Sequence, residues 1–341
     1  MPESDASGTG WKKLVTIVIG MTALLIVLLT AFAMPAVNSG PHDIPIAVAG
    51  DPADAGELSA QLSDDHPGAY SVTTVAGTDD ARELILDREV YGAVDLTGTE
   101  TTMLLASAAS SAVAADLTSL ARELGKDGTT PVKVDDIRPF PDDDPNGAGL
   151  SAGALPVALG GWMAAVVLLM TVRGARYQAC GAAGVAIGGG LGLTAMMQYG
   201  FGTLDGNYWL TAIGAALGVS AAAWTILGLR TLLGGPGLAL GAVTLILLGN
   251  PLSGMSTAPE LLPAGWGTLG QLLPPGATGS LLRSLAYFDG SGAATPLAVL
   301  SCWTLGGAAM FAYGSRRAAR RVAVTEPGND ASSPVGSPSA T

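Results

Sequence analysis

Long apolar runs separated by short polar breaks dominate this chain. The first run extends from Leu14 to Met34, and the later runs cover residues 152–172, 177–198, 208–229, 232–248 and 293–313. An α-helix needs ~20 apolar residues to cross a bilayer, and these runs approach or reach that length. The pattern therefore predicts an α-helical polytopic membrane protein with about six transmembrane helices.

A different pattern fills residues 35–150, where short strand-like and helix-like segments alternate. Apolar and β-branched residues predict strands at 44–50, 70–76, 91–98, 101–108 and 131–141. Helical spacing lies between them, at 54–65, 79–90 and 111–126. In the last helix, one face carries Val113, Leu117, Leu120, Ala121 and Leu124. The alternation predicts a small extracytoplasmic α/β domain between transmembrane helices 1 and 2.

The composition agrees with a membrane protein. The chain of 341 residues is 49% hydrophobic and only 13% charged, whereas soluble domains have about 25% charged residues. We attribute the net charge of -12 to acids that solvate the α/β domain. Basic residues flank the apolar runs and form no patch elsewhere, which argues against nucleic-acid binding. Cys180 and Cys302 lie in or beside apolar runs, so the α/β domain has no disulfide framework.

The basic residues also predict an orientation. If six helices cross the membrane, every basic group that flanks them falls on the same side: Lys12, Lys13, Arg173, Arg176, Arg230 and residues 316–321. Because short cytoplasmic flanks are rich in Lys and Arg, we expect both termini in the cytoplasm and residues 36–150 outside the plasma membrane. The first run is long for the apolar core of a signal peptide, so we interpret it as an uncleaved helix.

These patterns predict five successive parts. They are a cytoplasmic segment (1–13), transmembrane helix 1 (14–34), the extracytoplasmic α/β domain (35–150), a membrane domain (151–315) and a basic, then disordered, cytoplasmic tail (316–341). Residues 1–10 are rich in small and polar residues like the tail, and we expect them to be disordered as well.

We find no set of catalytic residues, metal ligands or cofactor-binding motif, so we predict that the chain is not an enzyme. Asp142, Asp144, Asn146 and Gly147 match the first half of a calcium-binding loop, but Gly153 stands where that loop needs a bidentate Glu. We therefore interpret this segment as an acidic linker. The apolar runs contain almost no ionisable side chains, which argues against coupling to protons or sodium ions.

Small residues are abundant in the apolar runs instead. Gly184 and Gly188, and likewise Gly214 and Gly218, form G-x-x-x-G spacings. Such spacings allow two helices to approach closely. We predict that these glycines pack helices together, either within one subunit or at an interface between subunits.

The segment 250–290, between the last two apolar runs, is apolar but broken by Pro and Gly. Thr257 and Glu260 have the spacing of a helix N-cap and its third residue, so we expect a helix to begin there. "PPGATG" is expected to break the chain before a second short helix at 280–288. The two helices predict a re-entrant hairpin on the outer side. Glu260 and Arg283 then either pair at the membrane surface, or Arg283 extends to lipid phosphates.

Three motifs in this hairpin carry a resemblance to a known family. Asn250, Pro251, Ser253 and Gly254 form an "NP-x-SG" turn, which "LLPPG" and "LRSLAYF" follow. Together with a large external domain between the first two of six helices, the hairpin resembles that of ABC-2 type transporter permeases, in the branch related to the phage infection protein. The resemblance covers most of the chain by architecture and about forty residues by sequence. It implies an outer gate formed by these four residues with Glu260 and Arg283.

The resemblance also implies a function and partners. It implies the permease subunit of an exporter that moves an amphipathic or lipid-like substrate outward, as a homodimer or heterodimer in the lipid bilayer. Because the chain has no G-x-x-x-x-G-K-[ST] loop, the energy would come from a separate ATP-binding cassette ATPase. The alternative is a non-transporting, membrane-anchored surface protein: a receptor, an adhesion protein or a cell-envelope assembly factor.

Overall fold

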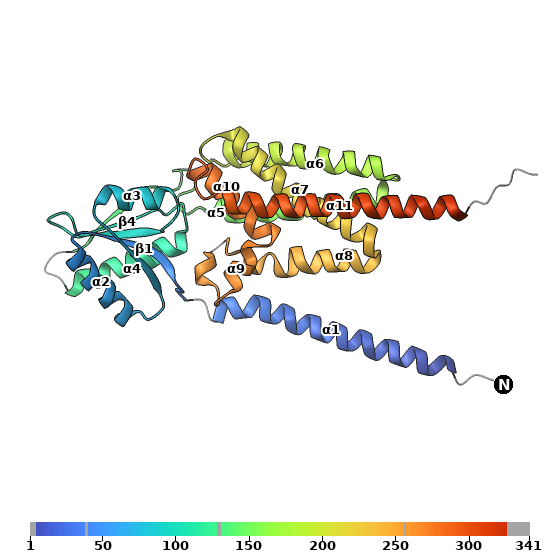
Figure 1. The fold of residues 1–341 in the computed structure, drawn as a ribbon, viewed down its shortest axis with the longest axis horizontal. Helices are drawn as coiled ribbons and strands as arrows, with labels where there is room; N and C mark the ends of the chain where they lie inside the picture. The colour runs from blue at the N-terminus through green and yellow to red at the C-terminus, as the bar shows by residue number, and fades with distance from the viewer. Residues whose placement is uncertain (1–4, 38–39, 128–130, 256, 326–341) are drawn as a thin grey trace, which may run out of the picture.

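The computed structural model describes residues 5–37, 40–127, 131–255 and 257–325. Figure 1 shows a small α/β domain at one end and a bundle of long helices that extends away from it. Helix α1 (Asp5–Val37) diverges from the bundle with increasing distance from the α/β domain. Over the described residues the chain is mostly helical with one sheet, as the sequence predicts.

The sheet of the α/β domain has five strands in the order β2-β1-β3-β4-β5. β1 pairs in parallel with β2 and β3, β3 pairs antiparallel with β4, and β4 pairs in parallel with β5. All the strands and helices predicted here are confirmed: β1 (Ile44–Ala49), α2 (Pro52–Asp65), β2 (Tyr70–Val75), α3 (Thr78–Leu86), β3 (Gly92–Asp95), β4 (Thr102–Leu105), α4 (Ser111–Asp127) and β5 (Lys133–Asp136).

The two faces of the sheet belong to different cores. Because side chains alternate along a strand, Ile46 and Val48 of β1 pack with residues of α2 and α4, whereas Ala47 and Ala49 pack with residues of α3. The predicted apolar face of α4 lies in the first of these cores. The second core continues into the helical bundle, which places the bundle on the α3 side of the sheet.

The bundle is built from apolar helices. They are α5 (Ala148–Thr171), α6 (Ala175–Ala195), α7 (Tyr208–Leu233), α8 (Gly235–Ala242) and α11 (Ala294–Thr325); α6 continues as the π-helix η1 (Met196–Gly200), and α8 as the π-helix η2 (Val243–Leu248). Within the described ranges, four helices are long and apolar enough to cross a membrane: Gly10–Met34, Ala175–Gly200, Tyr208–Leu233 and Ala294–Arg320. Two shorter apolar helices span Leu159–Thr171 and Gly235–Leu248.

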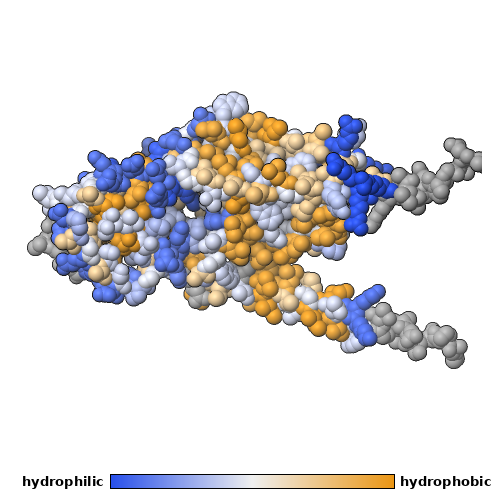
Figure 2. Space-filling view, viewed as in Figure 1, coloured by the Kyte–Doolittle hydropathy of each residue, from blue (hydrophilic) through white to orange (hydrophobic). Residues whose placement is uncertain are grey.

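Apolar side chains cover the outside of this bundle. Figure 2 shows apolar residues over the bundle and along α1, and hydrophilic residues over the α/β domain. Ile187, Ile213 and Leu305 are each more than half exposed. A soluble protein rarely exposes a continuous apolar surface of this size, so the bundle is compatible with a membrane location.

Several helix ends differ from the sequence prediction. Residues 5–10, which we expected to be disordered, belong to α1, and α1 continues past Pro35. Leu232 lies in the last turn of α7, which ends at Leu233, rather than beginning the next helix, because the chain turns at Gly234, which has a φ of 71°. An apolar run predicts which part of a helix is apolar, but the helix can continue into the polar residues on either side of that run. The tail predicted to be disordered lies outside the described residues from 326 onward.

Helix α7 lies at the centre of the bundle, and glycines of its neighbours pack against its backbone. A Cβ atom added at Gly190 of α6 would lie 2.6 Å from the carbonyl oxygen of Ala212. Gly161 of α5 and Gly307 of α11 approach the α7 backbone in the same way. Close backbone contact through small residues is a common way for helices to associate in a membrane.

The four glycines predicted from G-x-x-x-G spacing fall into two groups. Gly214 and Gly218 lie against the side chains of Leu285 and Thr278, which come from the segment before α11. Gly184 and Gly188 have no neighbouring atom within 4 Å of an added Cβ. Within the described chain, α6 therefore contacts α7 through Gly190 instead, while an interface between subunits stays a prediction for Gly184 and Gly188.

This packing predicts opposite effects for two substitutions in α6. Gly190→Ala should lower the free energy of unfolding by about 1–3 kcal/mol, because the added methyl group forces two backbones apart. Gly184→Ala is the matched control, and it should be neutral or slightly stabilising, because Ala favours a helix. Thermal and denaturant unfolding in detergent would measure both. Equal stabilities of the two variants would contradict the proposed packing.

Candidate functional site

The segment between α8 and α11 forms a folded hairpin. It contains the 3-10 helices η3 (Pro251–Ser253) and η4 (Pro259–Leu261) and the α-helices α9 (Trp266–Gln271) and α10 (Pro274–Tyr287). The prediction of a helix capped by Thr257 is wrong, because η4 begins after Ala258 and has no side-chain cap. The helix ends before Pro263, since a proline disfavours the continuation of a helix. The predicted break at "PPGATG" is also wrong. Pro274 and Pro275 instead occupy the first turn of α10, where Pro costs no hydrogen bond.

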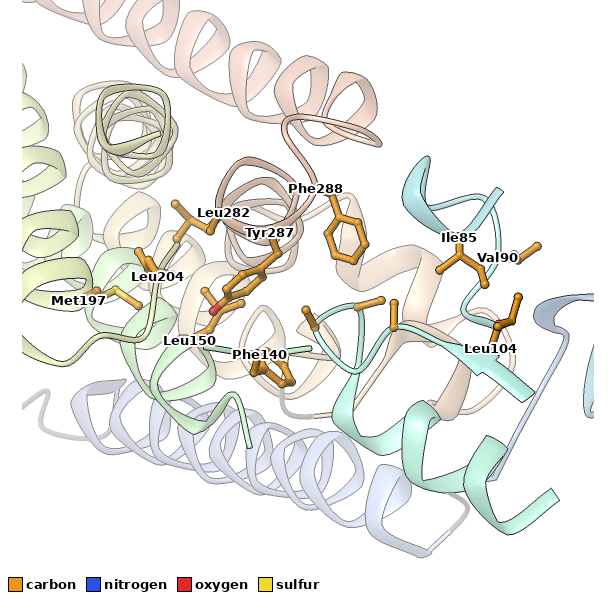
Figure 3. Packing of buried hydrophobic residues seen from close by; sticks show 14 of the residues in the cluster. Ile85, Val90, Leu104, Phe140, Leu150, Met197, Leu204, Leu282, Tyr287 and Phe288 are labelled. Atoms are coloured by element: carbon orange, nitrogen blue, oxygen red, sulfur yellow. The ribbon is translucent and has the colours of Figure 1, made fainter. Parts of the chain in front are cut away.

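Helix α10 is a buried wedge between the α/β domain and the bundle. All of its residues except Ser280 and Leu285 are buried. Its C-terminal residue Tyr287 stacks edge-on against Phe140, with ring centres 5.5 Å apart, and its hydroxyl donates to the carbonyl oxygen of Thr203 at 2.7 Å. Figure 3 shows Tyr287 and Phe288 between residues of the bundle and residues of the sheet domain. One apolar core therefore continues through the junction.

Arg88 reaches from the α/β domain onto this wedge. It follows α3 with a φ of 61°, which is uncommon for a residue other than Gly. Its Nη1 donates to the carbonyl oxygen of Ser280 at 3.2 Å and to the hydroxyl of Ser284, and its guanidinium lies 5.4 Å from the ring centre of Phe288. Burial, followed by the nearby charge of Arg283, lowers the pKa of Arg88 to about 10. Arg88 therefore stays charged at neutral pH.

The predicted "NP-x-SG" turn is joined to the same wedge. Pro251 begins η3, the hydroxyl of Ser253 donates to the carbonyl oxygen of Asn250, and Gly254 has a φ of 64°. The side-chain amide of Gln271 donates to the carbonyl oxygen of Ser253 at 2.8 Å. The turn is thereby held against α9.

Gln271 extends this link to Arg88. Its Oε1 accepts a hydrogen bond of 2.6 Å from the hydroxyl of Ser280. The carbonyl of Ser280 is the group that accepts from Arg88. A continuous polar path therefore runs from the "NP-x-SG" turn through α9 and α10 to the α/β domain, and the sequence alone did not predict it.

Glu260 and Arg283 come together, but not as the predicted pair. Among the described residues, no ion pair within 4.0 Å joins them. The carboxylate of Glu260 instead accepts from the hydroxyl of Tyr91 at 2.8 Å, and its carbonyl oxygen accepts from the backbone amide of His42 at 3.0 Å. Both contacts come from the α/β domain, so Glu260 fastens the hairpin to that domain.

Arg283 is also not extended toward the surface, since only 7% of it is exposed. Its Nη2 donates to the carbonyl oxygen of Met255 at 3.3 Å, and its Nε is buried without a hydrogen-bond partner. The alternative, in which this side chain reaches lipid phosphates on the membrane surface, is therefore not the arrangement in this structure.

A pocket of about 530 Å³ opens where the α/β domain meets the hairpin. Its polar and charged lining comes from both parts: His42, Asp43, Arg88, Tyr91, Glu260, Thr268, Gln271, Ser280, Arg283 and Thr295. Burial, followed by the charge of Glu260, raises the pKa of Tyr91, which keeps its phenol protonated as a donor. The pocket therefore combines cationic side chains with hydrogen-bond donors.

Sequence reasoning missed the contribution of the α/β domain to this pocket. Arg88 and Tyr91 lie in "LDREVYG", where they fit the end of a helix and the start of a strand. Nothing in the local pattern marks them as site residues. Only the docking of the hairpin brings them close to Glu260 and Arg283.

The acidic linker that contains the calcium-like motif leads directly into α5. The carboxylate oxygens of Asp144 accept hydrogen bonds from the backbone amides of Ala148 and Gly149, at 2.9 and 2.8 Å. The acid thus stabilises the start of α5, where backbone amides have no helical partner. No group of three His, Cys, Asp or Glu residues in the described ranges is placed to hold a metal ion.

Comparison of the chain with known protein families, with curated proteins and with solved structures found no match. The interpretation of the pocket therefore depends on its own geometry. That geometry is a polar pocket at the junction of two structural units, with charged groups supplied by each.

The contact between Tyr91 and Glu260 predicts a measurable loss of stability. Tyr91→Phe should lower the free energy of unfolding by about 1–3 kcal/mol, because a charged acceptor loses its hydrogen bond in a partly buried site. Tyr313→Phe is the control, since Tyr313 is 62% exposed and should tolerate the change. Thermal unfolding of the full chain in detergent would compare them. If the two variants melt together, the contact does not stabilise the junction.

Proposed function

We propose that this chain is the permease subunit of an ABC-2 type exporter. It moves an amphipathic or lipid-like substrate outward, with energy from a separate ATP-binding cassette ATPase. The burial of α10 is the observation that carries the proposal, since α10 contacts α5, α7 and α11 and also the α/β domain. A shift of these helices would therefore change the pocket at the junction, as an outer gate requires.

Six membrane-crossing helices are part of the proposal. They are α1, α5, α6, α7, α8 with η2, and α11. Of these six, α8 with η2 (Gly235–Leu248) is the shortest. At 1.5 Å per residue it extends about 21 Å, so it would need a locally thinned bilayer, or the hairpin would have to cover the rest of the membrane thickness. The π-helical turns η1 and η2 both occur within these helices, and such turns are frequent at functional sites.

The charge distribution supports the proposed orientation. The start of α1, the connection between α5 and α6, the end of α7 and the end of α11 all lie at the end of the bundle opposite the α/β domain. These are the segments that carry the predicted basic groups. Figure 2 shows hydrophilic surface at the far ends of α1 and the bundle. Under the positive-inside rule this end is cytoplasmic, and the α/β domain is outside the plasma membrane.

A second permease subunit would complete the proposed transporter. Most of α1 is exposed and apolar, with Leu29 exposed by 69%. Gly184 and Gly188 present a smooth face of α6 with open space beside it. Either surface suits close contact with another copy or a related subunit, and lipid would cover whichever surface stays free.

One observation favours the alternative of a non-transporting surface protein. The connections at the basic end are short: Val172–Gly174 lies between α5 and α6, and only Gly234 lies between α7 and α8. They offer an ATPase little surface beyond these turns and the segment near Trp11. An anchored receptor, adhesion protein or cell-envelope assembly factor would need no such surface.

Recovery of an ATPase partner tests the proposed function directly. Affinity purification of the full chain, after cross-linking in its native membrane, is expected to retain a subunit with a Walker A loop. Arg173→Glu with Arg176→Glu should reduce its recovery severalfold, because the change reverses the charge of the connection nearest the partner. Arg122→Glu, on the exposed surface of α4, is the control. Envelope proteins recovered without any ATPase would favour the alternative.

Cysteine labelling tests the topology separately. Cys180 and Cys302 are both exposed and are first replaced by Ala. Single cysteines at Asp79 and Asp205, which are exposed on the α/β side, should then react with a membrane-impermeant maleimide in intact cells. A cysteine at Arg176 should react only after permeabilisation. Labelling of position 176 in intact cells would overturn the proposed number of crossings.

A further inference from the structure

The guanidinium of Arg283 lacks the neutralising partner that a buried charge requires. The side chain is more than nine-tenths buried, its Nε has no hydrogen-bond partner, and its Nη2 contact to the Met255 carbonyl is long at 3.3 Å. Removing a charged group from water is unfavourable unless another charge or a full set of hydrogen bonds compensates it. Within the described chain, Arg283 has no ion pair within 4.0 Å and an incomplete set of hydrogen bonds.

Arg88 increases this positive charge. Arg88 and Arg283 line the same pocket, and the two charges repel each other. The hydrogen bonds of Arg88 go to a carbonyl and a hydroxyl of α10, which are neutral groups. The repulsion is therefore not relieved by the partners that Arg88 has.

The acidic residues that line the pocket offset the charge of these two arginines only in part, through Glu260. Glu260 is held by Tyr91 and His42, and it forms no ion pair within 4.0 Å with either arginine. Asp43 is exposed to solvent, where its charge is strongly screened. Among the described residues, no ion pair therefore removes the positive charge that Arg88 and Arg283 bring to the pocket.

We propose that this pocket binds a phosphoryl group, which Arg283 and Arg88 hold between α10 and the α/β domain. Guanidinium groups match the paired oxygens of a phosphate and form strong charge-assisted hydrogen bonds with them. Thr268, which also lines the pocket and is exposed, supplies a neutral hydroxyl donor. A pocket of about 530 Å³ has room for a phosphate ester rather than the bare ion alone.

The phosphoryl group could belong to a lipid headgroup or to a soluble phosphate, and the chemistry of binding is the same. The site stands at the junction of the bundle and the α/β domain, where both sources would have access. The inference goes beyond transport, because the pocket would bind its anion whether or not an ATPase drives the chain. Its test measures binding alone, so it can succeed where the proposed function fails.

The experiment uses the full chain in a detergent without phosphate. One arm adds inorganic phosphate, with chloride at equal ionic strength as control. The other arm adds dioleoyl phosphatidylglycerol to the micelles, with dioleoylglycerol, which has the same acyl chains and no phosphate, as control. Saturable thermal stabilisation is expected in at least one arm. Stabilisation by phosphate alone identifies a soluble source, and stabilisation by the phospholipid identifies a headgroup.

Variants locate the binding in this pocket. Arg283→Gln and Arg88→Gln should each weaken binding by about tenfold or more. Arg230→Gln should leave the affinity unchanged, because Arg230 lies in the last turn of α7, far from the pocket. Glu260→Gln keeps both arginines and removes a competing negative charge, so it should strengthen binding even if an arginine variant fails to fold. The proposal is overturned if neither probe stabilises the chain saturably, or if both Arg283→Gln and Glu260→Gln bind as the unmodified chain does.

Discussion

Tyr287 and Phe288, at the end of α10, join the core of the α/β domain to the core of the helical bundle. Their rings pack among residues of both units, and Phe140 closes the contact from the linker before α5. Because α10 is buried along almost its whole length, the α/β domain cannot move independently of it without exposing apolar surface to water. The pocket, the turn at residues 250–254 and the position of Arg88 all depend on this one helix.

Hydrogen bonds fix the orientation of the two units at this apolar contact. Hydrogen bonds from Arg88, Tyr91 and Ser110 of the α/β domain reach Ser280, Glu260 and the carbonyl of Thr257 in the hairpin. Apolar burial alone would allow the two units to slide, because it has no preferred orientation. Each hydrogen bond contributes only about 1 kcal/mol, but together they select one arrangement of the domain on the bundle.

The helices of the bundle pack through small and apolar residues rather than through ion pairs. Glycines of α5, α6 and α11 bring three helices against the backbone of α7, and Gly214 and Gly218 of α7 leave room for α10. The ionisable groups are thereby concentrated at the two ends of the molecule. Charged groups are unfavourable at membrane depth, so this distribution of charge is compatible with a bundle that lies in a membrane.

The sequence by itself determined the elements of this protein. Period-two and helical patterns predicted every strand and helix of the α/β domain, and the apolar runs predicted the long helices, because these signals arise from which side of each element is buried. Helix ends were less well predicted, as the start of α1 and the break at Gly234 show. Local patterns describe burial within an element but contain little information about its last turn.

Only the tertiary structure decided the site. Glu260 and Arg283 stood out in the sequence as isolated charges in an apolar segment, but their partners did not. Tyr91 lies 169 residues before Glu260 in the chain, and Arg88 lies 192 residues before the Ser280 that it contacts. No local pattern relates residues so far apart. The pairing of Glu260 with Tyr91 rather than Arg283 follows from how α10 packs between the two units, and that packing is set by the shapes of both cores together.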